Sequence, residues 1–321
     1  MVHSHIARGP PVVPGHPHAH PMTRSGFVAV VGRPNAGKST LLNALVGEHL
    51  AIVTPKAQTT RRRLTGIRSD EETQWVFIDT PGLLTPRTLF DTALLEGARL
   101  AIQDADVVLA LLDGTGERPE DLERLAAALA EKPNVPVVIA ISKSDLTDSR
   151  TATALEEWAR GTLAPAAVHP ISAIRGEGLD ALLESLAAHL PESPFYFPAD
   201  DLSAESVRDL VAELVRETVL EHYRQEIPYA VLCTVEEYRE ADDPVYIQVT
   251  LHVERDSQKR ILIGQKGAGI RELGTRSRGK IEDLIGRPVY LDLWVKVLKD
   301  WRKKAAVLAR HGFPVPGEGD R

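Results

Sequence analysis

The sequence predicts a doubly wound α/β domain followed by a smaller α+β domain. Three observations support this prediction. A strand-like apolar run leads into a glycine-rich loop and a helical pattern over residues 26–45. Two more strand-like runs, at 75–78 and 137–141, each end in polar residues. After residue 204 the order becomes helix, strand, strand, helix, glycine loop, helix and strand, and a length of 321 residues leaves room for both domains.

Bulk composition excludes several classes of protein. The formal net charge is −7, the apolar runs are short, and Cys233 is the single cysteine. We therefore expect neither a membrane span nor a disulfide framework, and we expect a reducing, cytoplasmic compartment. Cys233 lies in an apolar strand-like run and is expected to be a small buried side chain.

Residues 1–24 form an N-terminal extension of different character. The stretch is rich in Pro and His, and it has neither a periodic apolar face nor the apolar core of a signal peptide. We expect it to be disordered. Its histidines are loosely spaced, which is more typical of a solvated tail than of a metal site. Met22, just before the first strand, is an alternative start.

The first motif follows the strand expected at 26–31 and matches G-x-x-x-x-G-K-[ST]. It comprises Gly32, Arg33, Pro34, Asn35, Ala36, Gly37, Lys38 and Ser39, followed by Thr40. Strand, loop and helix in this order are typical of a P-loop, which binds nucleotide phosphates. The glycines let backbone N–H groups turn toward phosphate, Lys38 brings a positive charge to the β- and γ-phosphates, and the Ser39 hydroxyl can bind magnesium.

The strand expected at 75–78 ends in an acidic motif. Its residues are Asp79, Thr80, Pro81, Gly82 and Leu83. An acidic side chain at a strand end is the second magnesium position of P-loop nucleotide hydrolases. Gly82 lacks a Cβ and can bring its N–H to the γ-phosphate. Many such enzymes place glutamine next, to orient the attacking water, and Leu83 cannot do this.

Two later loops are candidates for reading the base. The first comprises Ser142, Lys143, Ser144 and Asp145, and the second Ser172 and Ala173. They resemble the N-K-x-D and S-A motifs of translation-factor-like GTPases, in which Asp accepts hydrogen bonds from guanine. Asp145 therefore predicts GTP in preference to ATP, because adenine would leave its carboxylate unpaired. Ser142 stands where Asn is usual, and since serine is shorter with one donor, we expect weaker binding of the same base.

A threonine between these motifs would complete the magnesium shell in the GTP state. The run Gln-Thr-Thr-Arg at 58–61, together with G-R-P-N-x-G-K-S, resembles the Era family of ribosome-associated GTPases, and the resemblance spans residues 26–302. It implies that Thr60 is the metal ligand, with Thr59 as the neighbouring alternative. The implied magnesium ligands are Ser39, Thr60 and Asp79.

The resemblance also bears on catalysis. The residues expected to act on the phosphates are Lys38, Thr60, Asp79 and Gly82. Era-like proteins have a hydrophobic residue where Leu83 stands, which implies a slow intrinsic rate. Asn35 matches a P-loop asparagine that helps to hold a potassium ion in related GTPases, and such an ion could substitute for an arginine finger. The alternative is that Asn35 only shapes the loop.

A second domain is expected in the C-terminal part of the chain. The predicted boundaries are 25–190 for the first domain, 191–203 for a Pro-rich linker, 204–312 for the second domain and 313–321 for a tail. The predicted elements of the second domain are a helix over 204–226, strands over 229–237 and 244–253, a G-x-x-G loop, a helix running to residue 285 and a strand over 289–297. This order resembles a type II KH domain.

The G-x-x-G loop is the candidate RNA site. Its glycines allow a backbone to lie against that of about four nucleotides. The expected RNA-binding residues are Ile263, Gly264, Gln265, Lys266, Gly267 and Arg271. Such a loop alone could also merely cap a helix, but the preceding apolar run and the element order favour the KH interpretation. Trp294 could stack on a base, although we expect it, like Trp301, to pack within the protein.

The charge distribution agrees with an RNA site. Residues 255–310 contain fifteen Lys or Arg and six Asp or Glu, whereas residues 204–254 contain four and twelve. A chain that is acidic overall thus concentrates positive charge around the glycine loop. A solvated helix face is the alternative explanation.

Together these features predict a protein that binds RNA and hydrolyses GTP with Mg²⁺. The hydrolysis is expected to serve as a timer. The resemblance implies binding to the 3′ end of 16S rRNA in the 30S subunit, a role in maturation of that subunit, a monomer, and peripheral membrane association. Two alternatives remain open at this stage. One is a metabolic P-loop kinase that prefers ATP. The other is an RNA-binding assembly protein whose nucleotide site is degenerate because of Ser142.

Overall fold

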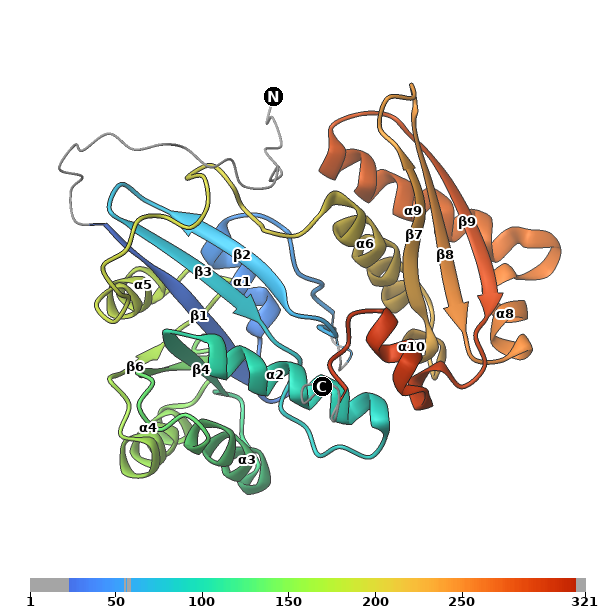
Figure 1. Ribbon diagram of the computed structural model, residues 1–321. Coiled ribbons are helices and arrows are strands. Elements are labelled where there is room, and N and C mark those ends of the chain that lie inside the picture. The colour runs from blue at the N-terminus through green and yellow to red at the C-terminus, as the bar shows by residue number, and fades with distance from the viewer. Residues whose placement is uncertain (1–22, 55, 57–58, 316–321) are drawn as a thin grey trace.

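The computed structural model describes residues 23–54, 56 and 59–315, which form two domains lying side by side (Figure 1). The first domain is built on a six-stranded sheet of order β2-β3-β1-β4-β5-β6. Its strands are β1 (Arg24–Gly32), β2 (Leu64–Ser69), β3 (Thr73–Asp79), β4 (Val107–Asp113), β5 (Val137–Ser142) and β6 (Ala167–Pro170). All neighbouring strands are parallel except β2 and β3, which are antiparallel.

Helices cover both faces of this sheet, so the predicted doubly wound class is confirmed. Alternate residues of each strand fill two separate cores, as Val28 and Val30 do on one side and Ala29 and Val31 on the other. The first face is covered by α1 (Lys38–Val46) and α5 (Leu179–Ala187). The second is covered by α2 (Leu89–Asp104), α3 (Pro119–Ala130) and α4 (Ser149–Leu163). Every residue of β3 and β4 is buried, as expected of central strands in a sheet with helices on both faces.

The second domain has a three-stranded sheet of order β7-β8-β9. Its elements are α6 (Val207–His222), α7 (Ile227–Ala230), β7 (Leu232–Arg239), β8 (Val245–Val253), α8 (Asp256–Ile263), η1 (Gln265–Gly267), α9 (Ala268–Ile285) and β9 (Val289–Val297). The final strand has the predicted bounds. The strand expected from residue 229 begins only at Leu232, because Pro228 lies in the first turn of α7. Cys233 is buried as expected, and burial raises the pKa of its thiol to about 12.

The expected ends and linker are more structured than predicted. Arg24, placed in the disordered extension, is the first residue of β1, while residues 1–22 lie outside the described chain. Segment 191–203 passes β3, where the Gln74 side chain donates to the Phe197 carbonyl at 2.8 Å, and then reaches the edge strand β2, where the Ile67 N–H donates to the Leu202 carbonyl at 2.9 Å. Phe313, placed in the tail, is 3% exposed. Within the described residues, no helix is long and apolar enough to cross a bilayer.

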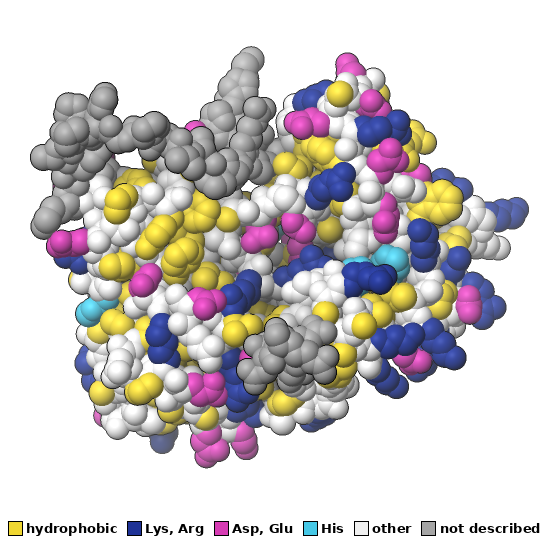
Figure 2. Space-filling model, in the orientation of Figure 1, with side chains coloured by type: hydrophobic (Ala, Val, Ile, Leu, Met, Phe, Trp, Pro, Cys, Tyr) yellow, Lys and Arg dark blue, Asp and Glu magenta, His cyan; other side chains and the backbone are white. Residues whose placement is uncertain are grey.

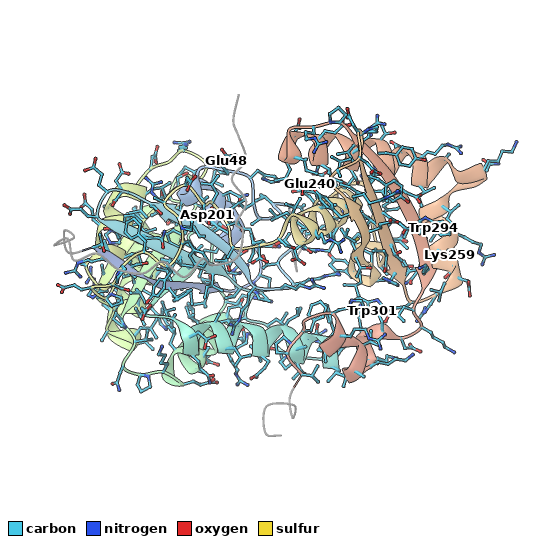
Figure 3. The ribbon with its side chains drawn as sticks, turned by 45° about the horizontal axis from the view of Figure 1, so that its top comes forward. Glu48, Asp201, Glu240, Lys259, Trp294 and Trp301 are labelled. Atoms are coloured by element: carbon cyan, nitrogen blue, oxygen red, sulfur yellow. The ribbon has the colours of Figure 1, made fainter. Side chains whose placement is uncertain are left out.

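An aromatic cluster joins the two domains. The Phe90 ring of α2 lies 5.2 Å from both the Trp301 ring and the Phe313 ring. Trp301 belongs to η2 (Trp301–Lys303), next to α10 (Ala305–Arg310), and Figure 3 labels it at the junction. Its indole N–H donates to the Ala230 carbonyl at 2.9 Å, and the side chain is fully buried. The prediction that Trp301 packs within the protein is confirmed.

Candidate functional site

The P-loop turns on residues in the left-handed region. Asn35 has φ 63°, and Gly37, at φ 97°, caps the N-terminus of α1 without a side-chain hydrogen bond. The first-turn N–H groups of α1 are therefore available to an anion. Gly82 packs against the loop so closely that a Cβ there would lie 2.5 Å from the Pro34 nitrogen. The loop and the motif after β3 thus form one surface that only glycine at 82 permits.

Lys38 lies in the floor of the P-loop. Its Nζ donates to the carbonyl oxygens of Gly32 at 3.2 Å and Arg33 at 2.9 Å. Burial lowers the pKa of Lys38 to about 8. The side chain lines a cavity of about 500 Å³ together with Ser39, Thr60, Gly82 and Lys143. The structure therefore brings the predicted phosphate residues, two of the predicted metal ligands and one residue of the first base loop to one space.

The three predicted magnesium ligands converge. The hydroxyls of Ser39 and Thr60 both donate to Asp79 Oδ2, at 2.8 and 2.7 Å, and lie 2.9 Å from each other. The second carboxylate oxygen, Asp79 Oδ1, is buried and accepts no hydrogen bond from the described residues. Burial raises the pKa of Asp79. A carboxylate and two hydroxyls are hard oxygen ligands, so this donor set fits Mg²⁺.

Thr59, the alternative ligand, contacts the second domain through its backbone. Its carbonyl oxygen accepts a hydrogen bond from the Arg216 guanidinium on α6. Thr60 is therefore the threonine that meets Ser39 and Asp79. The residue before this pair, Gln58, lies outside the described residues.

The base loop is attached directly to the P-loop. The Ser142 hydroxyl donates to the Ala36 carbonyl at 2.7 Å. Lys143, at φ 59°, donates from Nζ to the Asn35 carbonyl at 3.0 Å. Ser142 therefore connects the base loop to the P-loop although it is shorter than the asparagine that is usual at this position.

Asp145 lies beside the second base loop. A hydrogen bond from Ser172 lowers the pKa of Asp145 and keeps it an acceptor, as recognition of guanine requires. The Ser144 N–H donates to the Ile171 carbonyl at 3.0 Å, which brings the two loops together. Ser172 is fully buried, and Ala173 packs partly against the first core.

One component of this site escaped sequence reasoning. Asp113, at the end of β4, accepts from Lys143 Nζ at 2.6 Å and from Arg33 Nη2 at 2.5 Å. Arg33 also pairs with Glu117 at 3.1 Å. Burial opposes ionisation of Asp113, but the hydrogen bonds from Lys143 and Thr115 lower its pKa. The available signal was an apolar run ending in Asp, as at Asp79.

Leu83 turns away from the nucleotide cavity. It is 2% exposed and packs in the second core of the first domain, and its N–H donates to the Gly32 carbonyl at 3.0 Å. Its side chain offers no group that could orient a water molecule.

The segment around Thr60 also contacts the second domain, which the sequence did not reveal. The Arg61 guanidinium is 3% exposed and donates to the carbonyls of Val231 at 2.6 Å and Pro228 at 2.8 Å. Burial, reinforced by nearby Arg216, lowers the pKa of Arg61 to about 9. Because Arg61 adjoins Thr60, the metal ligand and this interdomain contact are neighbours in the chain.

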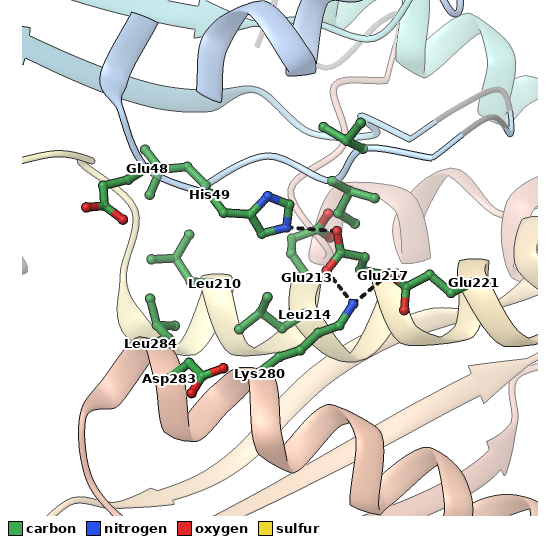
Figure 4. A pocket seen from close by; sticks show the side chains of 13 residues that line it. Glu48, His49, Leu210, Glu213, Leu214, Glu217, Glu221, Lys280, Asp283 and Leu284 are labelled. Atoms are coloured by element: carbon green, nitrogen blue, oxygen red, sulfur yellow. Dashed lines mark hydrogen bonds and ion pairs between the residues drawn. The ribbon is translucent and has the colours of Figure 1, made fainter. Parts of the chain in front are cut away.

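A second bridge lies further along the same interface. Figure 4 shows His49 of the first domain and Lys280 of α9 meeting on Glu217 of α6, at 3.0 and 2.7 Å. The hydrogen bond to Glu217 raises the pKa of His49. Lys56 Nζ adds a donation to the Tyr223 carbonyl at 2.6 Å. The described residues His49, Lys56, Thr59 and Arg61 thus tie this part of the first domain to the second domain, next to the nucleotide cavity.

The G-x-x-G loop has a backbone conformation that favours glycine at both of its ends. Gly264 and Gly267 have φ 71° and 77°, and a Cβ on Gly264 would lie 2.6 Å from the Gly269 nitrogen. Lys266, at φ 48°, and Gln265 are exposed on the loop. The Arg271 guanidinium lies over Gly267, 3.2 Å from where a Cβ would be. Among the described residues, neither Lys266 nor Arg271 has an ion-pair partner, and Ile263 packs on the core of this domain.

Comparison with known proteins agrees with this geometry. The family models for "50S ribosome-binding GTPase" and "KH domain" match residues 27–143 and 226–302. GTPase Era of Carboxydothermus hydrogenoformans is 39% identical over 292 residues, which are 90% of this chain and 98% of that protein. The chain belongs to the Era family. The predicted resemblance is confirmed, and with it the assignment as a GTPase that converts GTP to GDP and phosphate, which excludes the metabolic kinase.

Two solved structures extend the comparison. An Aquifex aeolicus Era variant bound to GDP·AlF4⁻ and an Era in complex with MgGDPNP and nucleotides 1506–1542 of 16S ribosomal RNA each have a TM-score of 0.85 and 36% identity. Each match covers 91% of this chain and 100% of the other chain. These relatives bind nucleotide, and the second binds it with Mg and RNA.

Proposed function

We propose that this Era-family GTPase binds the 3′ end of 16S rRNA through the Gly264–Gly267 loop and acts in maturation of the 30S subunit, with GTP controlling how its two domains hold the RNA. The observation that carries the proposal is the position of residues 59–61. Thr60 lies in the metal site while Arg61 and the Thr59 carbonyl are bonded to the second domain. The RNA-bound relative supports the choice of RNA.

The residues of the first domain divide the chemistry among them. Ser39, Thr60 and Asp79 would hold Mg²⁺, which neutralises charge on the β- and γ-phosphates when bound. Lys38 and the N–H groups at the start of α1 bind and orient those phosphates. Asp145 accepts from guanine, and Ser142 keeps the base loop against the P-loop. Since Leu83 cannot position water, the intrinsic rate is slow.

Coupling follows from the shared segment. In the GTP state Thr60 would be held as a ligand of Mg²⁺, and a fixed Thr60 would hold its neighbour Arg61 on the carbonyls of Pro228 and Val231. Hydrolysis removes the third phosphate and frees Thr60. The contacts of Arg61 that help to orient the second domain are then weakened, and the affinity for RNA changes. The protein acts as a cytoplasmic monomer that associates peripherally with the membrane, as the family resemblance implies.

Fluorescence anisotropy tests this function. A single-stranded RNA that copies the 16S 3′ end is titrated with native protein and with Gly267→Asp, each with a GTP analogue and with GDP. Tighter binding with the analogue, lost in the variant, is expected. Equal binding in both nucleotide states would show that the switch controls another partner. Equal binding by native and variant protein would remove the role assigned to the glycine loop.

A further inference from the structure

The outer face of the second sheet carries exposed aromatic side chains. Along β9, Val289 and Val295 are buried, and the alternation places Tyr290 and Trp294 on the opposite face. These rings are 60% and 51% exposed, and Figure 3 labels Trp294 on the outer strand of the sheet. About half of the Trp294 side chain is therefore buried, in line with the expectation of partly buried packing, and the other half is open to solvent. Its indole N–H donates to Asp292 at 2.7 Å, which fixes the ring on the surface.

Exposed cations also follow β9 along the chain, as far as the end of α10. Lys296, Lys299, Lys304 and Arg310 are exposed, and none of them forms an ion pair with a described residue. Lys296 pairs in register with His252, whose ring lies 5.9 Å from that of His311. The strand and the end of α10 therefore form one surface. Figure 2 shows dark-blue side chains gathered on this part of the molecule.

We define Trp294, Lys296, Lys299, Lys304 and Arg310 as the outer-face band. Its chemistry favours nucleic acid over protein, because lysine is depleted at protein interfaces. An exposed indole can stack on any unpaired base, and lysines with no partner can neutralise phosphates. No described helix of this domain's core lies on the band, since α6, α8 and α9 pack on the other face of the sheet.

The helices that carry the glycine loop and the aromatic rings of the band lie on opposite faces of the same edge strand, β9. β9 is an edge strand, since the sheet order is β7-β8-β9. Both helices that flank the Gly264–Gly267 loop pack against β9. A strand of RNA held by that loop can therefore cross the edge of β9 and continue over Trp294.

We propose that the outer-face band is a second RNA contact surface, in which Trp294 stacks on an unpaired base and the cations hold the adjoining backbone. This inference rests on the proposed RNA-binding function. It predicts that the length of RNA bound exceeds the four or so nucleotides that a G-x-x-G loop contacts.

The test compares two RNAs by fluorescence anisotropy. One is a short RNA of about six nucleotides that the glycine loop alone can hold, and the other continues beyond it. Trp294→Ala is expected to weaken the longer RNA about fivefold or more and to leave the short RNA unchanged, while Trp294→Phe keeps near-native affinity. The double variant Lys296→Ala/Lys299→Ala is expected to lower the slope of log K against log salt by about one to two.

Controls separate this proposal from the proposed function. GTP hydrolysis and the thermal midpoint are expected to be native in Trp294→Ala, because the indole is on the surface. Native affinity of that variant for the longer RNA overturns the band as a contact surface, as does an equal loss on both RNAs. If the native protein binds neither RNA, or Gly267→Asp binds both normally, the proposed function itself fails.

Discussion

The hydroxyl of Ser142 donates to the carbonyl oxygen of Ala36 at 2.7 Å, so a hydrogen bond connects the loop that reads the base directly to the P-loop. Asparagine is usual at this position. The shorter serine makes the connection because β5 ends close enough to the P-loop that a Cβ on Gly37 would be 4.0 Å from the Ser142 oxygen. The nucleotide site is therefore not degenerate because asparagine is missing. The contribution of the hydrogen bond between Ser142 and Ala36 can be tested by substitution.

Ser142→Ala leaves the Ala36 carbonyl without its donor. One lost hydrogen bond is worth about 1 kcal/mol, so the Kd for GDP is expected to rise about fivefold in a titration with a fluorescent GDP. Ser144→Ala is the matched control, since the Ser144 hydroxyl has no bond to the P-loop and only its backbone N–H holds Ile171. Identical affinities of the native protein and Ser142→Ala for GDP would show that the hydrogen bond to Ala36 is not needed for nucleotide binding.

Nucleotide affinity is expected to fall at alkaline pH because of Lys38. Burial lowers the pKa of Lys38 to about 8 in the free protein, and bound phosphate favours the charged form and raises it. Binding then takes up a proton, so affinity is full below about pH 7 and falls by up to about tenfold per pH unit above pH 8. Calorimetry at pH 8.5 in two buffers of different ionisation enthalpy measures this uptake directly.

Folding stability of the free protein has the opposite trend. The folded-state pKa of Lys38 lies below the unfolded value of 10.5. The unfolded chain therefore holds more protons between those two values, and this group makes the free protein more stable as the pH rises through them. Lys38→Met removes both trends, and proton uptake that persists in this variant would assign the effect to another group.

Arg61→Ala is expected to uncouple the domains. The change leaves the Pro228 and Val231 carbonyls buried without a donor, at a cost of about 2–3 kcal/mol in the free energy of unfolding. RNA affinity should then no longer depend on whether the GTP analogue or GDP is bound. Denaturant unfolding and the anisotropy titration measure the two effects.

Arg63→Ala is the matched control for Arg61. The Arg63 guanidinium pairs at 2.8 Å with Asp104, which is 60% exposed, and donates from Nε to the Gly97 carbonyl at 3.2 Å, so both of its contacts lie within the first domain. Such surface pairs contribute less than about 1 kcal/mol. Nucleotide-dependent RNA binding that survives Arg61→Ala would place the coupling elsewhere in the interface.

Local spacing explains what the sequence could predict. The P-loop, the motif after β3 and the G-x-x-G loop are each formed by consecutive residues, whose backbone conformation is set by glycines such as Gly37 and Gly264. A strand that ends in Asp79 places its carboxylate at the edge where the P-loop also lies, because both strands are parallel in one sheet. Family resemblance then distinguished Thr60 from Thr59.

Long-range partners explain what it could not. Arg61 looks like any other arginine until the fold buries it against carbonyls 167 and 170 positions away. Asp113 needs Arg33 and Lys143 from two other loops to become part of the site. Trp294 has the same strand pattern whether its outer face is covered or open, and only the domain arrangement leaves it exposed.

Potassium is expected to stimulate hydrolysis through the P-loop. Leu83 is buried and carries no group that could orient water, so a monovalent cation near the phosphates would supply charge that an arginine finger provides elsewhere. The Asn35 side chain lines the nucleotide cavity beside Gly82. Exchanging NaCl for KCl at constant ionic strength is expected to raise the single-turnover rate about tenfold.

The variant Asn35→Gly tests where that ion is held. Asn35 has φ 63°, a conformation that glycine adopts without strain, so the variant removes the side chain while the loop keeps its shape and its affinity for GDP. Hydrolysis should then proceed at one slow rate in both salts. Equal rates for the native protein in KCl and NaCl would rule potassium out. Stimulation that persists in Asn35→Gly would leave Asn35 as a residue that shapes the loop.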